Sequence, residues 1–483
     1  TLNYYIEPNE GYDNRSAEII FYDKNSDLKD TLKVEQAQKD AIVISQKTYE
    51  VKAEGETIEV RLSTNVEIEL IMPDIDWISQ TESRSLTEHA FFFKIAKNEE
   101  SKSRLAKIVL KDKDSELSET LLIKQMSEYG NFEFRDNNHN VAYIELYEAG
   151  TLSKTFDLNT SYDERTKIVK LKVAGPINGN DISYLRFYKL NLDLSEATIV
   201  EGEYDFWYES RPNTFTSSKA YNVNNMVGDN MFCFASFTGI TLPQNVTSIG
   251  KEAFYNCPNL TFVDMGNEIT SIGDYAFAEC NKLWNISIGS GVTSIGEGCF
   301  ESSSVSSIVI PDNITYLGKA AFYKCLKLKS VAIGHGLTSI KDYTFYGCES
   351  LAYMEIPDNI ISIGEQALGD CSSLSSVNIG NGVISIGKEA FRECNMLASV
   401  SIGKNVMNIG PKAFYDCLIS NFYSYATTPP ELIYTYGNGF FHDGDPFRNG
   451  LSKDAKLYVS AGTSEAYKTS SWANHFTDII EME

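Results

Sequence analysis

A repeat of 22 or 23 residues between about Met226 and Leu418 constrains the fold of this 483-residue chain more than any other feature. Successive units share an apolar residue at the second position and, in all but one, a phenylalanine six residues after the first. The units begin 23, 23, 22, 23, 23, 23 and 23 residues apart, at Ser248, Ser271, Ser294, Tyr316, Ser339, Ser362, Ser385 and Asn408. A degenerate unit with Val227 and Phe232 in these places precedes them, so we expect about nine coils. A fixed period of this length is typical of a solenoid, in which each unit packs on its neighbours.

Equivalent positions are apolar in every unit, which predicts a core that runs through all coils. Residues such as Leu283, Ile286 and Ile288 end in a period-two alternation that predicts a short strand. Strands stacked about 4.8 Å apart would hydrogen-bond from coil to coil. Gly or Pro after each predicted strand marks a turn. The phenylalanine column is Phe254, Phe277, Phe300, Phe322, Phe345, Leu368, Phe391 and Phe414.

Cysteine forms a further column, three residues after the phenylalanine. Seven of the nine cysteines lie in it, and Cys233 and Cys299 lie outside. They could be metal ligands or form disulfides, but the chain has no C-x-x-C pair, and side chains stacked in parallel are poorly oriented for the disulfide torsion. We expect reduced, buried core residues. The column is Cys257, Cys280, Cys325, Cys348, Cys371, Cys394 and Cys417.

The motif Leu-x-x-Leu-x-Leu followed by Ile-Gly-x-x-Ala-Phe-x-x-Cys resembles the BspA-like, or treponemal-type, leucine-rich repeat in nearly every coil. Residues 149–152, 174–182 and 192–199 are similar to the N-terminal cap of that family, and residues 457–468 with Trp472 are similar to its closing segment. The resemblance implies a right-handed leucine-rich-repeat solenoid over residues 226–418, an α/β cap over 128–225 and a C-terminal cap over 419–483. It also implies a surface protein of host-associated anaerobic bacteria that serves adhesion or interaction.

A second repeat lies before residue 130. An offset of 89 residues pairs Arg15 with Arg104 and Gln36 with Gln125, among other identities. Two copies of one domain are implied, of which the first is present only as its back half. Half a sandwich would expose its inner face, so this half should pair with something else or be the remnant of a cut domain. The two segments are residues 1–37 and 38–127.

Alternating apolar residues such as Ile58, Val60 and Leu62 predict a small antiparallel β-sandwich for residues 38–127. This segment resembles an Ig-like sandwich of the BACON type. The residues that stand where that pattern expects them are Gly55, Thr64, Asn65, Trp77, Asn98, Arg104, Ile123 and Gln125. The resemblance implies binding of carbohydrate or mucin. Trp77 is the obvious residue to contact a sugar, although a tryptophan between alternating strands is more often part of the core.

Charge and motifs exclude several classes of function. The 42 basic and 66 acidic residues give a net charge of −24, which repels nucleic acid. No stretch is long and apolar enough for a membrane helix, and any secretion signal or lipid anchor would precede residue 1. The histidines lie in no catalytic or metal-binding motif, and no P-loop, Rossmann or nucleophile-elbow motif occurs. We expect no catalytic residue, metal or cofactor. The histidines are His89, His139, His335, His442 and His475.

Two acidic clusters could bind calcium but are better explained as loops. Asp23, Asn25 and Asp27 align with Asp112, Asp114 and Glu116 across the 89-residue offset. The sixth position, which is glycine in EF-hand loops, is leucine in both copies and no bidentate glutamate follows, so a charged hairpin turn is favoured. The second cluster, which is His442, Asp443 and Asp445, is predicted to be a solvated loop.

Surface aromatics are the best candidates for ligand binding. Phe262, Trp284 and Tyr353 are expected on the strand face, where neighbouring coils have serine, and Tyr323 and Tyr346 directly follow the phenylalanine column. Aromatic rings give contact area at low entropic cost, stack on sugars and anchor protein interfaces. Alternatively, these rings only cover the edges of the coils and lean on their neighbours.

The sequence therefore predicts a secreted or cell-surface, non-enzymatic binding protein, attached to the outer membrane or fully secreted. The solenoid would recognise a protein ligand such as a host matrix or surface glycoprotein, because extended repeat surfaces suit large partners. The sandwiches would act as spacers. The alternative is a polysaccharide- or mucin-binding surface component, and a purely structural spacer is a third possibility.

Overall fold

The structure, a computed structural model, describes residues 5–11, 14–36, 39–81, 90–100, 102–211, 214–434 and 444–483. These residues form two compact units, which comprise residues 1–131 and 132–483. His89, His442 and Asp443 lie outside the described residues.

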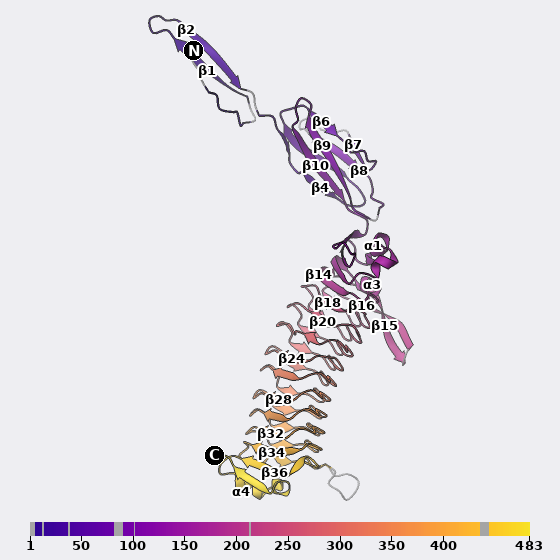
Figure 1. Cartoon of the computed structure of the whole chain (residues 1–483), viewed down its shortest axis with the longest axis vertical. Coiled ribbons are helices and arrows are strands. Elements are labelled where there is room, and N and C mark those ends of the chain that lie inside the picture. Colours follow the sequence, from indigo (N-terminus) through magenta and orange to yellow (C-terminus); the bar gives the residue numbers. More distant parts are fainter. Residues whose placement is uncertain are drawn as a thin grey trace. The chain divides into compact units, whose positions relative to one another are not determined.

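The first unit contains one isolated hairpin and two four-stranded sheets (Figure 1). The hairpin consists of β1 (Arg15–Tyr22) and β2 (Lys29–Gln36). One sheet has the order β4 (Thr48–Val51), β10 (Ser118–Gln125), β9 (Arg104–Asp112) and β6 (Ile68–Ile71). The other has the order β3 (Ile42–Ile44), β5 (Thr57–Thr64), β8 (Ala90–Ile95) and β7 (Ile78–Thr81).

The two four-stranded sheets share one core. Alternation along β5 buries Ile58, Val60 and Leu62, as the sequence predicted, and Trp77 is buried in the same cluster. The guanidinium of Arg104 lies 4.4 Å from the Trp77 ring centroid, so this ring is covered by protein and is not free to stack on a sugar. The expectation of purely antiparallel strands was wrong in one place, because β4 pairs with β10 in parallel.

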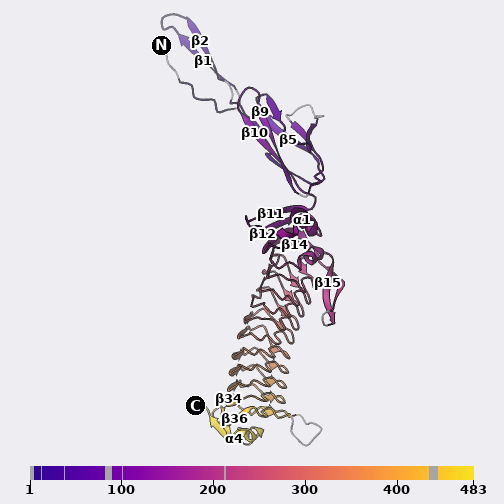
Figure 2. The same cartoon turned by 45° about the vertical axis from the view of Figure 1, so that its right-hand side comes forward.

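The second unit is a β-solenoid of about 13 turns, consistent with a leucine-rich-repeat solenoid (Figures 1 and 2). One side of the coils carries parallel strands that pair from coil to coil in three successive sheets, and this side is called the strand face or first ladder below. Its strands are β12 (Val141–Leu146), β13 (Lys170–Ile177), β14 (Asn191–Ile199), β18 (Gly239–Thr241), β20 (Phe262–Asp264), β22 (Asn285–Ile286), β24 (Ser307–Ile310), β26 (Ser330–Ile333), β28 (Tyr353–Ile356), β30 (Ser376–Ile379), β32 (Ser399–Ile402), β34 (Ile419–Ser424), β36 (Leu451–Val459) and β37 (Asp478–Glu481). The winding therefore continues on both sides of the 22- and 23-residue repeat.

Each regular coil also contains a second, two-residue strand that the sequence did not predict. These strands form two successive five-stranded parallel sheets, together called the second ladder below. The first consists of β17 (Met226–Val227), β19 (Ser248–Ile249), β21 (Ser271–Ile272), β23 (Ser294–Ile295) and β25 (Tyr316–Leu317). The second consists of β27 (Ser339–Ile340), β29 (Ser362–Ile363), β31 (Ser385–Ile386), β33 (Asn408–Ile409) and β35 (Glu431–Leu432). A glycine usually follows each of these two-residue strands, because a side chain there would collide with the preceding coil. A Cβ at Gly273, for example, would lie only 2.6 Å from the carbonyl carbon of Gly250. The close approach of successive coils thus explains the Ile-Gly signature.

The remaining elements belong to the irregular coils at the two ends. They are β11 (Gly130–Phe134), α1 (Leu152–Asn159), α2 (Tyr162–Arg165), α3 (Gly179–Leu185), α4 (Ser464–Lys468) and the 3-10 helix η1 (Ser471–Asn474). A hairpin of β15 (Gly202–Arg211) and β16 (Thr214–Asn222) extends from the coil that carries it (Figure 2). No helix among the described residues is long and apolar enough to span a membrane.

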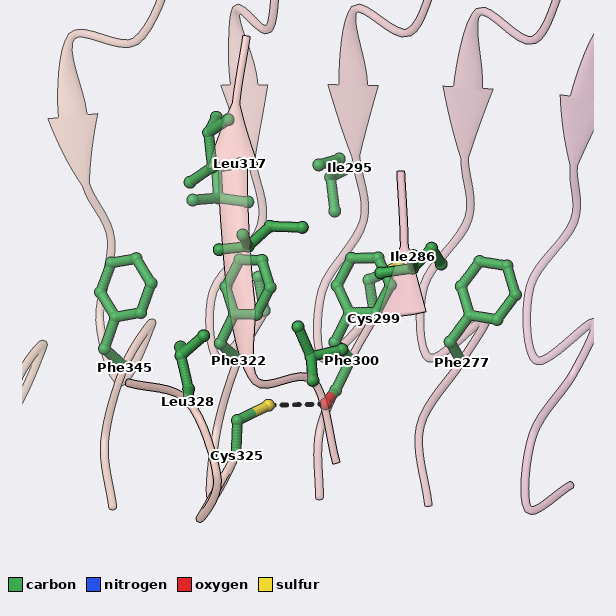
Figure 3. Close-up of a cluster of buried hydrophobic side chains, with 14 of the residues drawn as sticks. Phe277, Ile286, Ile295, Cys299, Phe300, Leu317, Phe322, Cys325, Leu328 and Phe345 are labelled. Atoms are coloured by element: carbon green, nitrogen blue, oxygen red, sulfur yellow. Dashed lines mark hydrogen bonds between the residues drawn. The ribbon is translucent and has the colours of Figure 1, made fainter. Parts of the chain in front are cut away.

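One continuous hydrophobic core runs from Ala142 to Phe476. The rings of the phenylalanine column stack in parallel within this core, as Figure 3 shows for Phe277, Phe300, Phe322 and Phe345. The ring centroids of Phe277 and Phe300 are 5.6 Å apart, and those of Phe300 and Phe322 are 5.2 Å apart. At the C-terminal end, Phe447 and Trp472 pack on the last rings, so the end of the core is covered.

Candidate functional site

The strand face presents two outward columns of side chains, on either side of a buried column. Strand pairing places Phe262 opposite Asn285 and Tyr353 opposite Ser376, so these four residues share the first outward column. Trp284 precedes Asn285 and lies one residue outside this column. The register thus separates Trp284 from the column that Phe262 and Tyr353 share, although each of the three lies between a buried leucine and the next apolar residue.

Three large apolar side chains are strongly exposed on the strand face, and we call them the strand-face cluster. They are Trp284, Val309 and Tyr353, which are 58%, 66% and 49% exposed. Trp284 and Val309 belong to adjacent coils, and Val309 and Tyr353 to coils that are two steps apart, or about 10 Å at 4.8 Å per coil. Desolvation and the neighbouring carboxylate of Glu355 raise the pKa of Tyr353, so its hydroxyl stays protonated, and it donates to Glu355 Oε2 at 3.5 Å.

Phe262, by contrast, has a packing role. Its half-buried ring occupies the space above Gly239 in the preceding coil, where a Cβ would lie 2.1 Å from the ring. A phenylalanine that fills the place of a missing side chain contributes to stability more than to a binding surface.

Tyr323 and Tyr346 lie in the turn segment between the two ladders and stack on each other. Their ring centroids are 5.2 Å apart with an interplanar angle of 12°, and Lys324 Nζ lies 5.3 Å from the Tyr323 centroid. The Tyr346 ring also approaches Gly369, whose Cβ would lie 3.0 Å from it. These contacts match the alternative in which the tyrosines lean on neighbouring coils.

All nine cysteines are free and buried, which confirms the prediction from the column. Burial raises the pKa of the Cys325 thiol to about 12, so the group is neutral at physiological pH. Within the described ranges, no three His, Cys, Asp or Glu side chains are grouped closely enough to hold a metal ion.

Comparison with protein-family models places the repeat region in a known family. Residues 225–338 and 316–429 match the BspA type leucine rich repeat region. The repeat region belongs to the BspA-type leucine-rich repeats. Residues 1–37 match the BACON domain. No curated protein matches the chain.

Several solved structures are similar to this chain at low identity. A leucine-rich repeat protein of Bacteroides ovatus shares 20% identity, with 68% of this chain and 98% of that chain covered and a TM-score of 0.33. A leucine-rich repeat protein of Eubacterium ventriosum shares 18% identity, with 66% and 98% covered and a TM-score of 0.35. A leucine-rich cell surface protein of Faecalibacterium prausnitzii shares 17% identity, with 72% and 97% covered and a TM-score of 0.26.

The BspA-type solenoid has a second aromatic group that sequence reasoning missed. Tyr423 on β34 and Tyr458 on β36 pair across the strand face and stack with ring centroids 4.7 Å apart. Tyr425, two residues after Tyr423, is exposed. The spacing of the repeat could have located this group in the sequence. Asn421 follows Ser399 by 22 residues and pairs with it, so one more coil lies after Leu418. The cysteine and phenylalanine motifs do not recur in that coil at the regular spacing.

The acidic loop of the first unit is a hairpin turn, as predicted. Asp23 Oδ1 accepts the backbone N–H of Asn25 at 3.2 Å, and Asp23 Oδ2 accepts the hydroxyl of Ser26 at 2.6 Å. These hydrogen bonds hold the pKa of Asp23 below its usual value. Both carboxylate oxygens of Asp23 thus accept hydrogen bonds that stabilise the turn between β1 and β2.

The described histidines are dispersed. His335 lies on an exposed turn beside Asp312, as expected. His475 is largely buried next to Tyr434, and burial lowers its pKa although Asp445 Oδ1 lies 3.7 Å from Nε2. Asp445, the described member of the second acidic cluster, therefore faces a largely buried histidine at the C-terminal end of the solenoid.

Proposed function

We propose that this BspA-type chain is a non-enzymatic recognition protein of the cell surface, and that its strand-face cluster binds a protein ligand. The observation that carries the proposal is the exposure of Val309 and Tyr353 on strands of the strand face and of Trp284 directly before β22. An exposed tryptophan and tyrosine are the side chains that most often dominate the energy of a protein interface. The extracellular location rests on the family of the repeat.

The spacing of the cluster favours a large partner. Its members span four successive coils, and the intervening outward residues are small, such as Ser330 and Ala332. A protein surface can cover several coils at once and bury all three side chains in a single interface of standard size. Adhesion to a host matrix or surface glycoprotein is the form of recognition that we propose.

We also propose that residues 38–127 are a second BACON-type domain that acts as a spacer. The BACON match covers residues 1–37, and β9 and β10 form a hairpin with the same pairing as β1 and β2 at an offset of 89 residues. The burial of Trp77 supports a spacer more than a sugar-binding role, because the ring is occupied by its own core.

The test is binding of the 483-residue chain to a panel of immobilised extracellular-matrix glycoproteins, measured by surface plasmon resonance. The variant W284A/V309S/Y353A should bind at least about 30-fold more weakly, since one interface hot spot contributes about 2 kcal/mol or more. Tyr316→Ala is the matched control, because Tyr316 is 48% exposed but lies on the other ladder. Unchanged binding by the triple variant overturns the assigned site, and failure of every glycoprotein to bind overturns the class of ligand.

The alternative function, recognition of a polysaccharide or mucin, is favoured by the tyrosines of the last coils. Tyr423, Tyr425 and Tyr458 lie together beside the polar residues Asn421 and Lys456, and sugar sites combine aromatic rings with polar groups in this way. A glycan array distinguishes the two functions. Binding that is lost in Y423A/Y458A and retained in W284A/V309S/Y353A supports the alternative.

A further inference from the structure

The second ladder carries a column of outward side chains directly before its two-residue strands. Five coils have threonine at this place, and four of these hydroxyls bond to the preceding coil. Thr270 Oγ1, for example, donates to the carbonyl oxygen of Thr247 at 3.1 Å, and Thr293 Oγ1 donates to that of Thr270 at 3.2 Å. Threonine therefore suits this place, because its hydroxyl gains a partner within the chain. The five threonines are Thr247, Thr270, Thr293, Thr315 and Thr338.

The next three coils have an apolar residue at the same place, and we call these three residues the apolar stripe. They are Ile361, Ile384 and Met407, which are 48%, 40% and 62% exposed. The backbone N–H of Ile384 donates to the carbonyl oxygen of Ile361 at 2.8 Å, and that of Met407 donates to the carbonyl oxygen of Ile384 at 2.8 Å. The three side chains therefore lie on adjacent coils. Single exposed apolar side chains are common, but contiguous ones mark a surface of association.

The surface on one side of the apolar stripe is flat. Half-buried serines, Ser362 and Ser385, directly follow its first two members. Glycine comes two residues later, where a Cβ at Gly387 would lie 2.6 Å from the carbonyl carbon of Gly364. Small residues of this kind cannot cover the exposed side chains beside them. Such a surface fits another flat face better than a narrow peptide, since interfaces require complementary shapes.

A column of turn residues borders the other side of the apolar stripe, and its charge changes sign along the column. Asp358, Asn381 and Lys404 are exposed at the equivalent corner of three adjacent coils, three residues before each member of the stripe. Asp358 Oδ1 accepts the backbone N–H of Asn381 at 2.6 Å, and Asn381 Oδ1 accepts that of Lys404 at 3.2 Å. The border is therefore negative at one end of the stripe, neutral in the middle and positive at the other end.

We propose that the apolar stripe is an interface between two copies of this chain, which pack antiparallel about a twofold axis over Ile384. This axis places Ile384 on the same residue of the second copy, and Ile361 on Met407 of the second copy. It also places Asp358 of each copy opposite Lys404 of the other. Complementary charges at the border of an interface fix its orientation and speed encounter.

The charge of the chain favours this arrangement over a parallel one. With a net charge of −24, two copies repel each other over most of their surface. The apolar stripe is uncharged, and antiparallel packing adds an attractive pair at each end of its border. Parallel packing would instead place Asp358 on Asp358 and Lys404 on Lys404, which is repulsive. The strand-face cluster lies on the first ladder, so dimerisation and ligand binding by that cluster are separate properties.

The first test is sedimentation equilibrium of the 483-residue chain at protein concentrations on the order of 100 µM, because small interfaces are weak. We expect the mass of a dimer. The variant I361T/I384T/M407T should raise the dissociation constant at least about 10-fold. Because threonine is native to this place in five other coils, the variant should keep its circular dichroism and melting temperature. Leu326→Thr is the matched control, since Leu326 is 49% exposed but directly follows the cysteine column, outside both ladders.

The second test is a charge swap, which examines the antiparallel orientation. Lys404→Asp places two carboxylates opposite each other at both ends of the border and should weaken dimerisation at least about 10-fold. Adding Asp358→Lys should restore the dimer, and lysine is native to this corner two coils further on, at Lys404. A monomeric wild type overturns the proposal, as does a dimer that the triple threonine variant leaves unchanged. A double variant that dimerises as weakly as Lys404→Asp alone overturns the antiparallel arrangement.

Discussion

The thiol of Cys325 donates a hydrogen bond to the backbone carbonyl oxygen of Phe300, 3.0 Å away in the preceding coil (Figure 3). The other cysteines of the column make the same contact at 3.1–3.3 Å. They are Cys257, Cys280, Cys348, Cys371, Cys394 and Cys417. The carbonyl lies in the turn segment, outside both ladders, so the thiol supplies a bond that the strands do not.

Variants at one of these cysteines should therefore separate the contribution of side-chain volume to stability from the contribution of the hydrogen bond. Cys348→Ala removes a buried sulfur and the bond to Phe322, and we expect a loss of about 1–2 kcal/mol in the free energy of unfolding. Cys348→Ser keeps a donor and should cost less, since Ser303 occupies this column naturally. Urea denaturation measures both, and a serine variant less stable than the alanine variant would contradict the role of the bond.

Alkaline pH should destabilise the solenoid through the same thiols. Burial raises the pKa of Cys325 and Cys417 to about 12, from 9.0 for a free thiol. Because the folded-state pKa is above the unfolded one, the stabilisation is complete below pH 9 and is lost as pH rises from 9 towards 12. Relative to neutral pH, each of these buried thiols should lower the free energy of unfolding by about 1.4 kcal/mol at pH 10.

The pH effect can be assigned to a single residue. Burial raises the pKa of Cys348 well above 9.0, so the stability difference between the wild type and Cys348→Ala should shrink between pH 8 and pH 10. Circular dichroism in urea at each pH gives this difference. A constant difference over that range would show that Cys348 does not contribute.

The solenoid was predictable because its period is visible in residues that the core requires. The isoleucine, phenylalanine and cysteine columns each correspond to buried side chains in the structure. The second ladder was not predictable, because two-residue strands such as Ser271–Ile272 are too short to show an alternation. The irregular outer coils lack the period, and only strand pairing shows that they continue the winding.

The candidate site was harder to predict than the fold. Trp284 was placed with Phe262 because both follow a buried leucine, but only the hydrogen-bonded register shows that Phe262 faces Asn285. Val309 was not named, because a valine between two isoleucines in a strand looks like a core residue until its side is known. Exposure depends on which side of the strand faces water. When both sides carry apolar residues, the sequence alone does not show which side that is.

A carboxylate that links two coils should contribute to stability. Asp274 Oδ1 accepts the backbone N–H of Glu297 in the next coil at 2.7 Å, and Asp342 does the same for Glu365 at 2.8 Å. We expect Asp274→Ala to lower the free energy of unfolding by about 1 kcal/mol and to speed hydrogen exchange at the Glu297 amide. Asp274→Asn keeps an acceptor oxygen and should have less effect. Equal losses in both variants would assign the effect to charge instead of to the hydrogen bond.

Each regular coil has a residue with left-handed backbone directly before the cysteine column, and only one of these residues is glycine. Ser302 has φ of 56°, and Gly347 occupies the equivalent place with φ of 70°. A side chain in this conformation costs about 1–2 kcal/mol, and glycine loses about 0.4–1 kcal/mol more backbone entropy on folding. Ser302→Gly should therefore raise the free energy of unfolding by about 0.5–1 kcal/mol, measured in urea. Ser302→Ala is the control, because alanine retains the left-handed strain and should give no gain. If the alanine variant is stabilised as much as the glycine variant, removal of the hydroxyl and not relief of backbone strain explains the change.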